Sequence, residues 1–118
     1  MRIAAFATIA IATLSAMPAL AAAPLCDGRL SLEATSAGRR ADSGTVVLVQ
    51  LRNTTGQRQD VSFALNGTRP GFRLSVQGVA IDAGGQFFGA IGRQNATFGS
   101  MPTVDELAAL LRVTCAAR

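Results

Sequence analysis

Two cysteines, Cys26 and Cys115, limit the folds open to this chain more than any other feature of its sequence. Cys26 stands just behind a run of small alanines, and Cys115 lies close to the end of the sequence. A cysteine placed like Cys26 is a lipid attachment point, a reactive or metal-binding thiol, or half of a structural disulfide. The residues around it, and the residue types that the sequence lacks, decide among the three.

The first 21 residues have the pattern of a secretory signal peptide. One positive charge precedes an uncharged apolar run, and Pro18 ends that run before it reaches the roughly 20 apolar residues of a transmembrane helix. An Ala-x-Ala site favours cleavage after Ala21, whereas cleavage after Ala23 would place a proline beside the scissile bond. We therefore expect a signal peptide at residues 1–21 and one exported domain at 22–118, in the bacterial periplasm or outside the cell.

Export favours a disulfide between Cys26 and Cys115. Lipidation needs a small residue directly before the cysteine, and Leu25 stands there. A metal site would need further ligands and a nucleophilic thiol would need a basic neighbour, but the sequence contains neither histidine nor lysine. Two cysteines allow a single pairing. The bond would close a loop of about 90 residues, which in the chain-entropy model stabilises a fold by about 4–5 kcal/mol.

Alternating apolar and polar residues predict a mostly β fold, a small antiparallel immunoglobulin-like β-sandwich of about six strands. Short turns rich in glycine, asparagine and proline separate the alternating segments. The pattern lacks the buried tryptophan and the paired inter-sheet cysteines of antibody domains. The expected strands cover residues 29–35, 45–53, 58–67, 72–81, 86–92 and 111–115.

The composition of these strands predicts how they are placed. The strand at 45–53 is apolar on both faces at its centre, which is typical of an interior position in a sheet, and it should pair with 58–67 in an antiparallel hairpin. Gly78 marks a bend or bulge within 72–81. The glycine-containing strand at 86–92 is short and weak, and we expect it at an edge of a sheet.

A short helix is expected just before the last strand. Thr103 and Glu106 have the spacing of a capping box, in which each side chain accepts a hydrogen bond from the main-chain amide of the other residue. The first and last strands should be antiparallel neighbours, because that arrangement brings the two cysteines together. The expected core consists of Val47, Val49, Leu51, Val61, Phe63, Leu65, Leu74 and Val76, with Val104, Leu107 and either Leu110 or Leu111 from the helix.

The missing residue types argue against an enzyme. Without histidine and lysine the chain has no Ser-His-Asp, Cys-His or Ser-Lys arrangement, and its seven acids fall mostly in turns and at the expected helix start. The glycine-containing strand lacks the spacing and the lysine of a phosphate loop. We therefore expect no catalytic residue, no metal and no cofactor.

The basic residues are all arginine, and eleven of them against seven acids give the full chain a net charge of +4. Nucleic-acid binding would need clustered charge with aromatic residues between, and Arg39 and Arg40 are the only adjacent pair, so we expect no nucleic acid. Three Asn-x-Thr triplets begin at Asn53, Asn66 and Asn95. We interpret them as turn residues rather than glycosylation acceptors, because the alanine- and arginine-rich composition is typical of a bacterial protein.

These observations favour a small exported binding or accessory domain without enzymatic activity. The alternative is a structural or assembly subunit that pairs through an edge strand. Loops at one end of the sandwich would bring Arg39, Arg40 and Arg69 together, and we expect this cluster to contact an unknown protein or an anionic component of the cell envelope. The competing interpretation is that these arginine side chains only keep the loops hydrated and contact no partner. The mature chain is expected to contain no membrane span.

Overall fold

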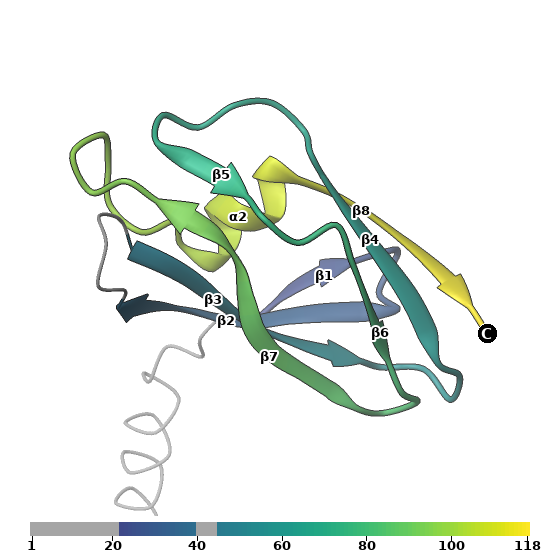
Figure 1. Cartoon of the computed structure of the whole chain (residues 1–118). Coiled ribbons are helices and arrows are strands. Elements are labelled where there is room, and N and C mark those ends of the chain that lie inside the picture. Colours follow the sequence, from purple (N-terminus) through teal and green to yellow (C-terminus); the bar gives the residue numbers. More distant parts are fainter. Residues whose placement is uncertain (1–21, 40–44) are drawn as a thin grey trace, which may run out of the picture.

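The computed structural model describes residues 22–39 and 45–118 (Figure 1). The expected signal peptide and Arg40 lie outside the described residues, as does the side chain of Arg39. In chain order the elements are β1 (Ala23–Leu25), β2 (Leu30–Arg39), β3 (Thr45–Asn53), β4 (Gln59–Leu65), β5 (Phe72–Leu74), β6 (Gly78–Ile81), β7 (Gln86–Gln94), α2 (Val104–Leu110) and β8 (Leu111–Ala117). Within these ranges no helix is long and apolar enough to cross a membrane.

The strands of the described chain form two antiparallel sheets. Sheet A has five strands in the order β1-β2-β3-β7-β5, and sheet B has three in the order β6-β4-β8. Sheet A curls like half of a barrel, with sheet B and α2 beside it (Figure 1). Register shifts in β2 and β7, where Glu33 and Ile91 are the extra residues opposite β3, accompany the curl, since a β-bulge bends its strand and increases the local twist. The predicted mostly β fold with one short helix before the last strand is confirmed, and it is compatible with a β-sandwich.

The core contains most of the residues predicted for it. Val47, Val49, Leu51, Val61 and Phe63 are confirmed as buried. Leu65 is 39 % exposed, however, so the prediction was wrong for this residue. Leu74 and Val76 are half-buried and pack against the core. Both sheets contribute further buried side chains: Leu30, Leu32, Phe72, Ile81 and Ile91.

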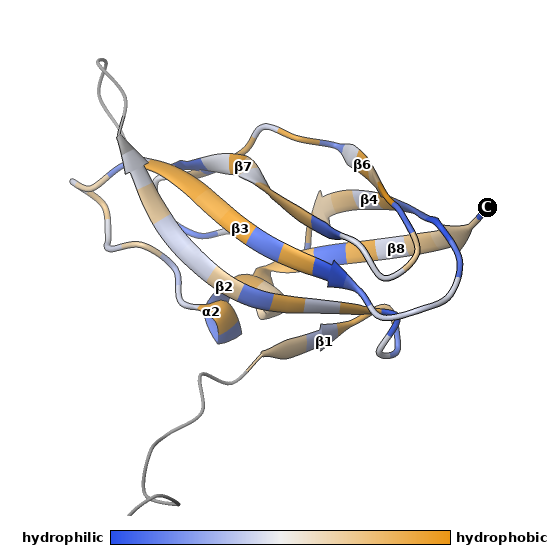
Figure 2. Cartoon of the chain, turned by 90° about the horizontal axis from the view of Figure 1, so that it is seen from below, coloured by the Kyte–Doolittle hydropathy of each residue, from blue (hydrophilic) through white to orange (hydrophobic). Residues whose placement is uncertain are grey.

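The interior position predicted for β3 is confirmed. This strand lies between β2 and β7, in the middle of sheet A. Val47 and Val49 face the core, while Val46 and Leu48 on the outer face are half-buried. Figure 2 shows the result as a strand that is apolar over its first half and alternates afterwards. Neighbours on both sides explain why this segment carries apolar residues on both faces.

The predicted hairpin between β3 and β4 is wrong. β3 belongs to sheet A and β4 to sheet B, so the turn after Asn53 carries the chain from one sheet to the other. The fully buried Asn53 side chain holds this corner, since its Nδ2 donates to the carbonyl oxygens of Gln57, Ile81 and Asp82 at 2.7, 3.0 and 3.0 Å. Alternation shows which face of a strand is buried, but either sheet can bury that face.

Two further strand predictions need correction, and one strand was missed. The strand predicted at 72–81 is two strands in different sheets: β5 pairs with β7, β6 pairs with β4, and Gly78 begins β6. β7 has nine residues rather than the predicted seven. It lies between β3 and β5, and β5 pairs with it at residues 92–94, so β7 is not an edge strand along that part. The missed strand, β1, has three residues and pairs with β2.

The helix begins as predicted. The Thr103 hydroxyl accepts from the amide of Glu106 at 3.2 Å, and the Glu106 carboxylate accepts from the amide of Thr103 at 2.9 Å, which completes the capping box. Leu107 is fully buried. Leu110 and Leu111 are both buried, because the chain passes directly from the helix into β8.

The disulfide between Cys26 and Cys115 is confirmed, with the two Cα atoms 6.0 Å apart. The bond joins the turn after β1, which belongs to sheet A, to β8, which belongs to sheet B. It therefore links the two sheets. The expectation that the first and last strands are neighbours in one sheet is wrong. Arg29 reinforces the connection, since its guanidinium donates to the carbonyl oxygens of Cys26 at 3.1 Å and Cys115 at 3.3 Å. The two sheets are therefore joined at this edge.

Candidate binding groove between β4 and β5

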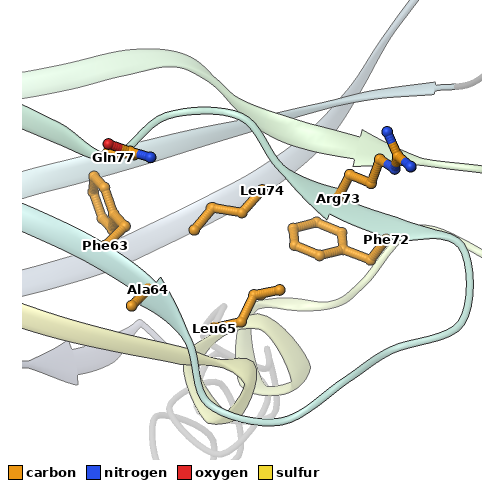
Figure 3. Close-up of a pocket in the computed structure, with 7 residues that line it drawn as sticks. All are labelled: Phe63, Ala64, Leu65, Phe72, Arg73, Leu74 and Gln77. Carbon is orange, nitrogen blue, oxygen red and sulfur yellow. The ribbon is translucent and has the colours of Figure 1, made fainter.

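The two sheets do not close at the other edge of sheet A, where β5 is the last strand. A groove of about 650 Å³ lies there between β4 and β5 (Figure 3). Its lining consists of Phe63, Ala64 and Leu65 from β4, Phe72, Arg73 and Leu74 from β5, and Gln77 from the crossing segment.

The groove exists because β5 and β6 follow different sheets. The amide of Phe63 donates to the carbonyl oxygen of Gln77 at 2.9 Å, which extends the pairing of β4 with β6 by one residue. Two residues earlier in the chain, the amide of Ser75 donates to the carbonyl oxygen of Ile91 at 2.8 Å, which draws the chain towards β7. The strands β4 and β5 therefore diverge from this crossing, and the space between them opens.

Main-chain groups on both strands face this space. In an antiparallel pair, the main-chain groups of every second residue point towards the partner strand. The amide of Ser75 donates to Ile91 of β7, so the main-chain groups of Phe72 and Leu74 face away from β7. The amide of Phe72 is satisfied within its own turn. On β4 the same alternation directs the N–H and C=O groups of Leu65 towards the groove, beyond the end of β6. The groove thus has a strand edge on each side.

The interior of the groove is apolar and its rim is basic. Phe63 and Phe72 form a buried floor, and Leu65 and Leu74 stand above it on opposite strands. Figure 3 shows these four side chains pointing towards one another, while Arg73 points away from them. No acidic residue lines the groove, and Arg73 forms no ion pair with any described residue.

The register across sheet A bears on the predicted arginine cluster. Arg39 pairs with Thr45, Thr45 with Gln94, and Gln94 with Phe72, so these residues form one row across four strands. Three strand spacings separate the ends of this row by about 14 Å. Arg69 comes three residues before Phe72. The main chain of Arg39 therefore lies at the same end of the sheet as the segment that carries Arg69.

The Arg69 side chain is engaged within the fold. Its Nε donates to the Gln94 side chain at 3.1 Å, its Nη2 donates to the carbonyl oxygen of Ser100 at 2.9 Å, and its Nη1 lies 3.6 Å from a carboxylate oxygen of Glu106. These contacts fasten the segment before β5 to β7 and to the start of α2. The contact with an anionic partner stays a prediction, because the side chains of the other two arginines lie outside the described residues.

A smaller hollow of about 430 Å³ lies beside this network. Its lining is Asn66, Gly67, Thr68, Arg69, Pro70, Glu106, Ala109 and Leu110. The main-chain amide of Thr103 holds the pKa of Glu106 below its ordinary value, and the charge of Arg69 acts in the same direction against the opposing effect of desolvation. The two charges in this hollow therefore stabilise each other and the start of α2.

The Asn-x-Thr triplets at Asn53 and Asn95 are turn residues, as predicted. The Asn53 side-chain oxygen accepts from the amide and the hydroxyl of Thr55 at 2.9 and 2.7 Å, and that of Asn95 accepts from the amide of Thr97 at 2.9 Å. Such bonds hold the chain in an Asx turn. Asn66 is exposed and follows β4 directly.

The described residues contain no group of three histidine, cysteine, aspartate or glutamate side chains that could hold a metal ion. No protein-family model, no curated protein and no solved structure is significantly similar to this chain. The geometry of the groove is therefore the main guide to its function.

Proposed function

We propose that this chain is a small exported domain that binds a partner in the bacterial periplasm or outside the cell and catalyses no reaction. The groove between β4 and β5 is the observation that carries the proposal, because it combines partly exposed apolar side chains with free strand edges. Apolar surface of this kind marks an interaction site more often than an ordinary surface. The disulfide supports an oxidising compartment.

The lining of the groove supports binding rather than catalysis. Arg73 is the only lining residue with a titratable side chain, and an arginine stays protonated in proteins. A catalytic site needs several convergent groups that can attack, or can donate and accept protons. Sandwiches of the immunoglobulin-like kind bind through edges and end loops, and we propose that this domain is used in the same way.

Self-assembly is the second candidate function. Phe88 on β7 is 66 % exposed, and Leu48 on the adjacent strand is half-buried. An apolar strip on the outer face of sheet A favours association with another copy. Size-exclusion chromatography of the oxidised protein over a wide concentration range separates the two functions, because a strict monomer at the highest concentration contradicts assembly.

Retention of an envelope partner tests the binding function. The oxidised protein is immobilised and exposed to bacterial envelope extract, in parallel with Leu65→Ser and Leu74→Ser. Phe88→Ser is the matched control, since it removes a more exposed apolar side chain outside the groove. We expect the wild type and the control to retain the same component and both groove variants to lose it. Retention that depends on Phe88 and not on the groove would refute the proposal.

A further inference from the structure

We infer that the groove takes an extended peptide segment of a partner protein, which adds as one strand to the free edge of β5 and alternates apolar with acidic side chains. This inference rests on the proposed binding function and names the chemistry of the partner.

The main chain of β5 is ready to pair with another strand. The N–H and C=O groups of Leu74 and the C=O group of Phe72 face away from β7, and no bulge interrupts β5. Proteins protect such an edge by keeping the strand short, as with the three residues of β5, or with a charged side chain, a proline, a bulge or a covering segment. In this domain the opposite edge of the sandwich is covered by the disulfide and by Arg29, whereas the β5 edge is left open. A peptide that adds to a free edge gains its affinity from these main-chain bonds.

The side chains of an added strand would meet two different surfaces. Successive residues of a strand point to opposite faces of the sheet. Those on the inner face would enter the groove between Leu74 and Leu65 and cover the rings of Phe63 and Phe72. Those on the outer face would lie beside Arg73. The matching sequence therefore alternates, with an apolar residue at every second position.

The charges at the rim favour acidic residues at the alternate positions. Arg73 on β5 is exposed, and it is directly opposite Arg93 on β7. Arg73 has no acidic partner among the described residues. Across the groove, the side chain of Arg112 on β8 donates a hydrogen bond to the Asn66 side chain at 3.5 Å. A carboxylate on the incoming strand would compensate the charge of Arg73.

The same charges disfavour a second copy of this chain as the occupant. Pairing two β5 edges would bring the Arg73 side chains of both copies to one face of a short joint sheet, which adds repulsion. A small apolar molecule would fill the groove but leave the main-chain groups of Leu74 and Leu65 without partners. An extended acidic peptide would cover the apolar floor, form hydrogen bonds with the strand edge and place carboxylates beside the basic rim.

Synthetic peptides test the inference directly. The oxidised mature protein is titrated at an ionic strength of about 0.15 M, where the Debye length is about 8 Å, with a peptide of four Glu-Val repeats, blocked at both ends, and with its Lys-Val counterpart. We expect the acidic peptide to bind at least tenfold more tightly. Arg73→Glu should weaken its binding about tenfold, through loss of an attraction and gain of a repulsion. Arg58→Glu is the matched control at the opposite end of the domain, and it should change the dissociation constant less than about twofold at that distance.

Main-chain methylation tests whether the peptide binds as a strand. Two further Glu-Val peptides carry N-methyl groups on all valine amides or on all glutamate amides. Only one set of amides of an added strand faces β5, so one methylated peptide should bind and the other should not. Leu74→Pro should abolish binding of the unmodified peptide while β5 keeps its bonds to β7, because the amide of Leu74 faces the free edge.

Three results would overturn the inference. They are equal binding of the acidic and basic peptides, equal binding of both methylated peptides, and dimerisation of the protein that Leu74→Pro abolishes. If no peptide binds but retention of an envelope partner still depends on Leu65 and Leu74, the strand inference fails and the proposed binding function stands. If that retention is also independent of the groove, both fail.

Discussion

Replacing Cys26 and Cys115 together by serine tests how far the stability of this domain depends on one covalent bond. The bond joins residues separated by 89 positions. In the chain-entropy model a loop of that length removes about 15 cal/mol/K from the unfolded ensemble, so the double variant should lose about 4–5 kcal/mol at 25 °C. For a domain of about 100 residues, this corresponds to a fall in melting temperature of about 20–35 °C.

Denaturant titration of the oxidised wild type, the reduced wild type and the double variant measures this loss. The slope of the unfolding free energy against denaturant should rise in both forms that lack the bond, because their unfolded chains are open and expose more surface. The reduced wild type is the control for local effects of serine at these half-buried positions. A loss below about 1 kcal/mol with an unchanged slope would refute the reasoning, since that is the range of ordinary surface changes.

Three further predictions concern the core, the β5–β7 contact and acid stability. Phe63→Ala should lower the free energy of unfolding by about 3–5 kcal/mol, whereas Leu65→Ala should lower it by less than about 1 kcal/mol, as denaturant titration would show. Gly92→Ala should cost about 1–3 kcal/mol and speed amide exchange in β5, because the added methyl group would meet the carbonyl oxygen of Arg73; unchanged exchange would count against this close approach. The pKa of Glu106 is lowered in the fold, so its contribution is fully present above its ordinary value of 4.5 and is lost as the pH falls through the lower folded value. Glu106→Gln should therefore flatten the fall in stability between pH 6 and pH 3, and an acid limb that is unchanged would contradict this role.

Features fixed by a few neighbouring residues were predictable from the sequence. The capping box of Thr103 and Glu106 needs only their spacing, and the run of apolar residues in β3 indicates neighbours on both sides. The disulfide followed from the presence of only two cysteines in a chain with the pattern of a signal peptide. The sheet to which each strand belongs was not predictable in this way, because the apolar face of β4 could be buried in either sheet.

The sequence around Gly78 contained a sign of the groove, but we interpreted it as a bend or bulge within one strand. The apolar residues are Phe72, Leu74 and Val76 before Gly78, and Ile81 after it, so the buried positions change from even to odd numbers. Such a change accompanies either a β-bulge or a crossing between sheets, and in this segment it accompanies a crossing. The sequence pattern also made Leu74 look like a core residue. Such a pattern shows which side chains of a strand face inward, but it does not show whether a neighbouring strand covers those side chains.

The inter-sheet disulfide also determines how this domain responds to a pulling force. A force applied to the chain before Cys26 and after Cys115 passes through the sulfur–sulfur bond and bypasses the residues between them. The segment from Cys26 to Cys115, which includes the groove, carries no tension while the bond is intact, and of the two sheets only β1 and the last two residues of β8 lie outside it. Reduction would let about 300 Å of chain extend, as expected for nearly 90 residues at about 3.5 Å each. A domain tethered on both sides would therefore keep its groove folded under tension for as long as the bond stays oxidised.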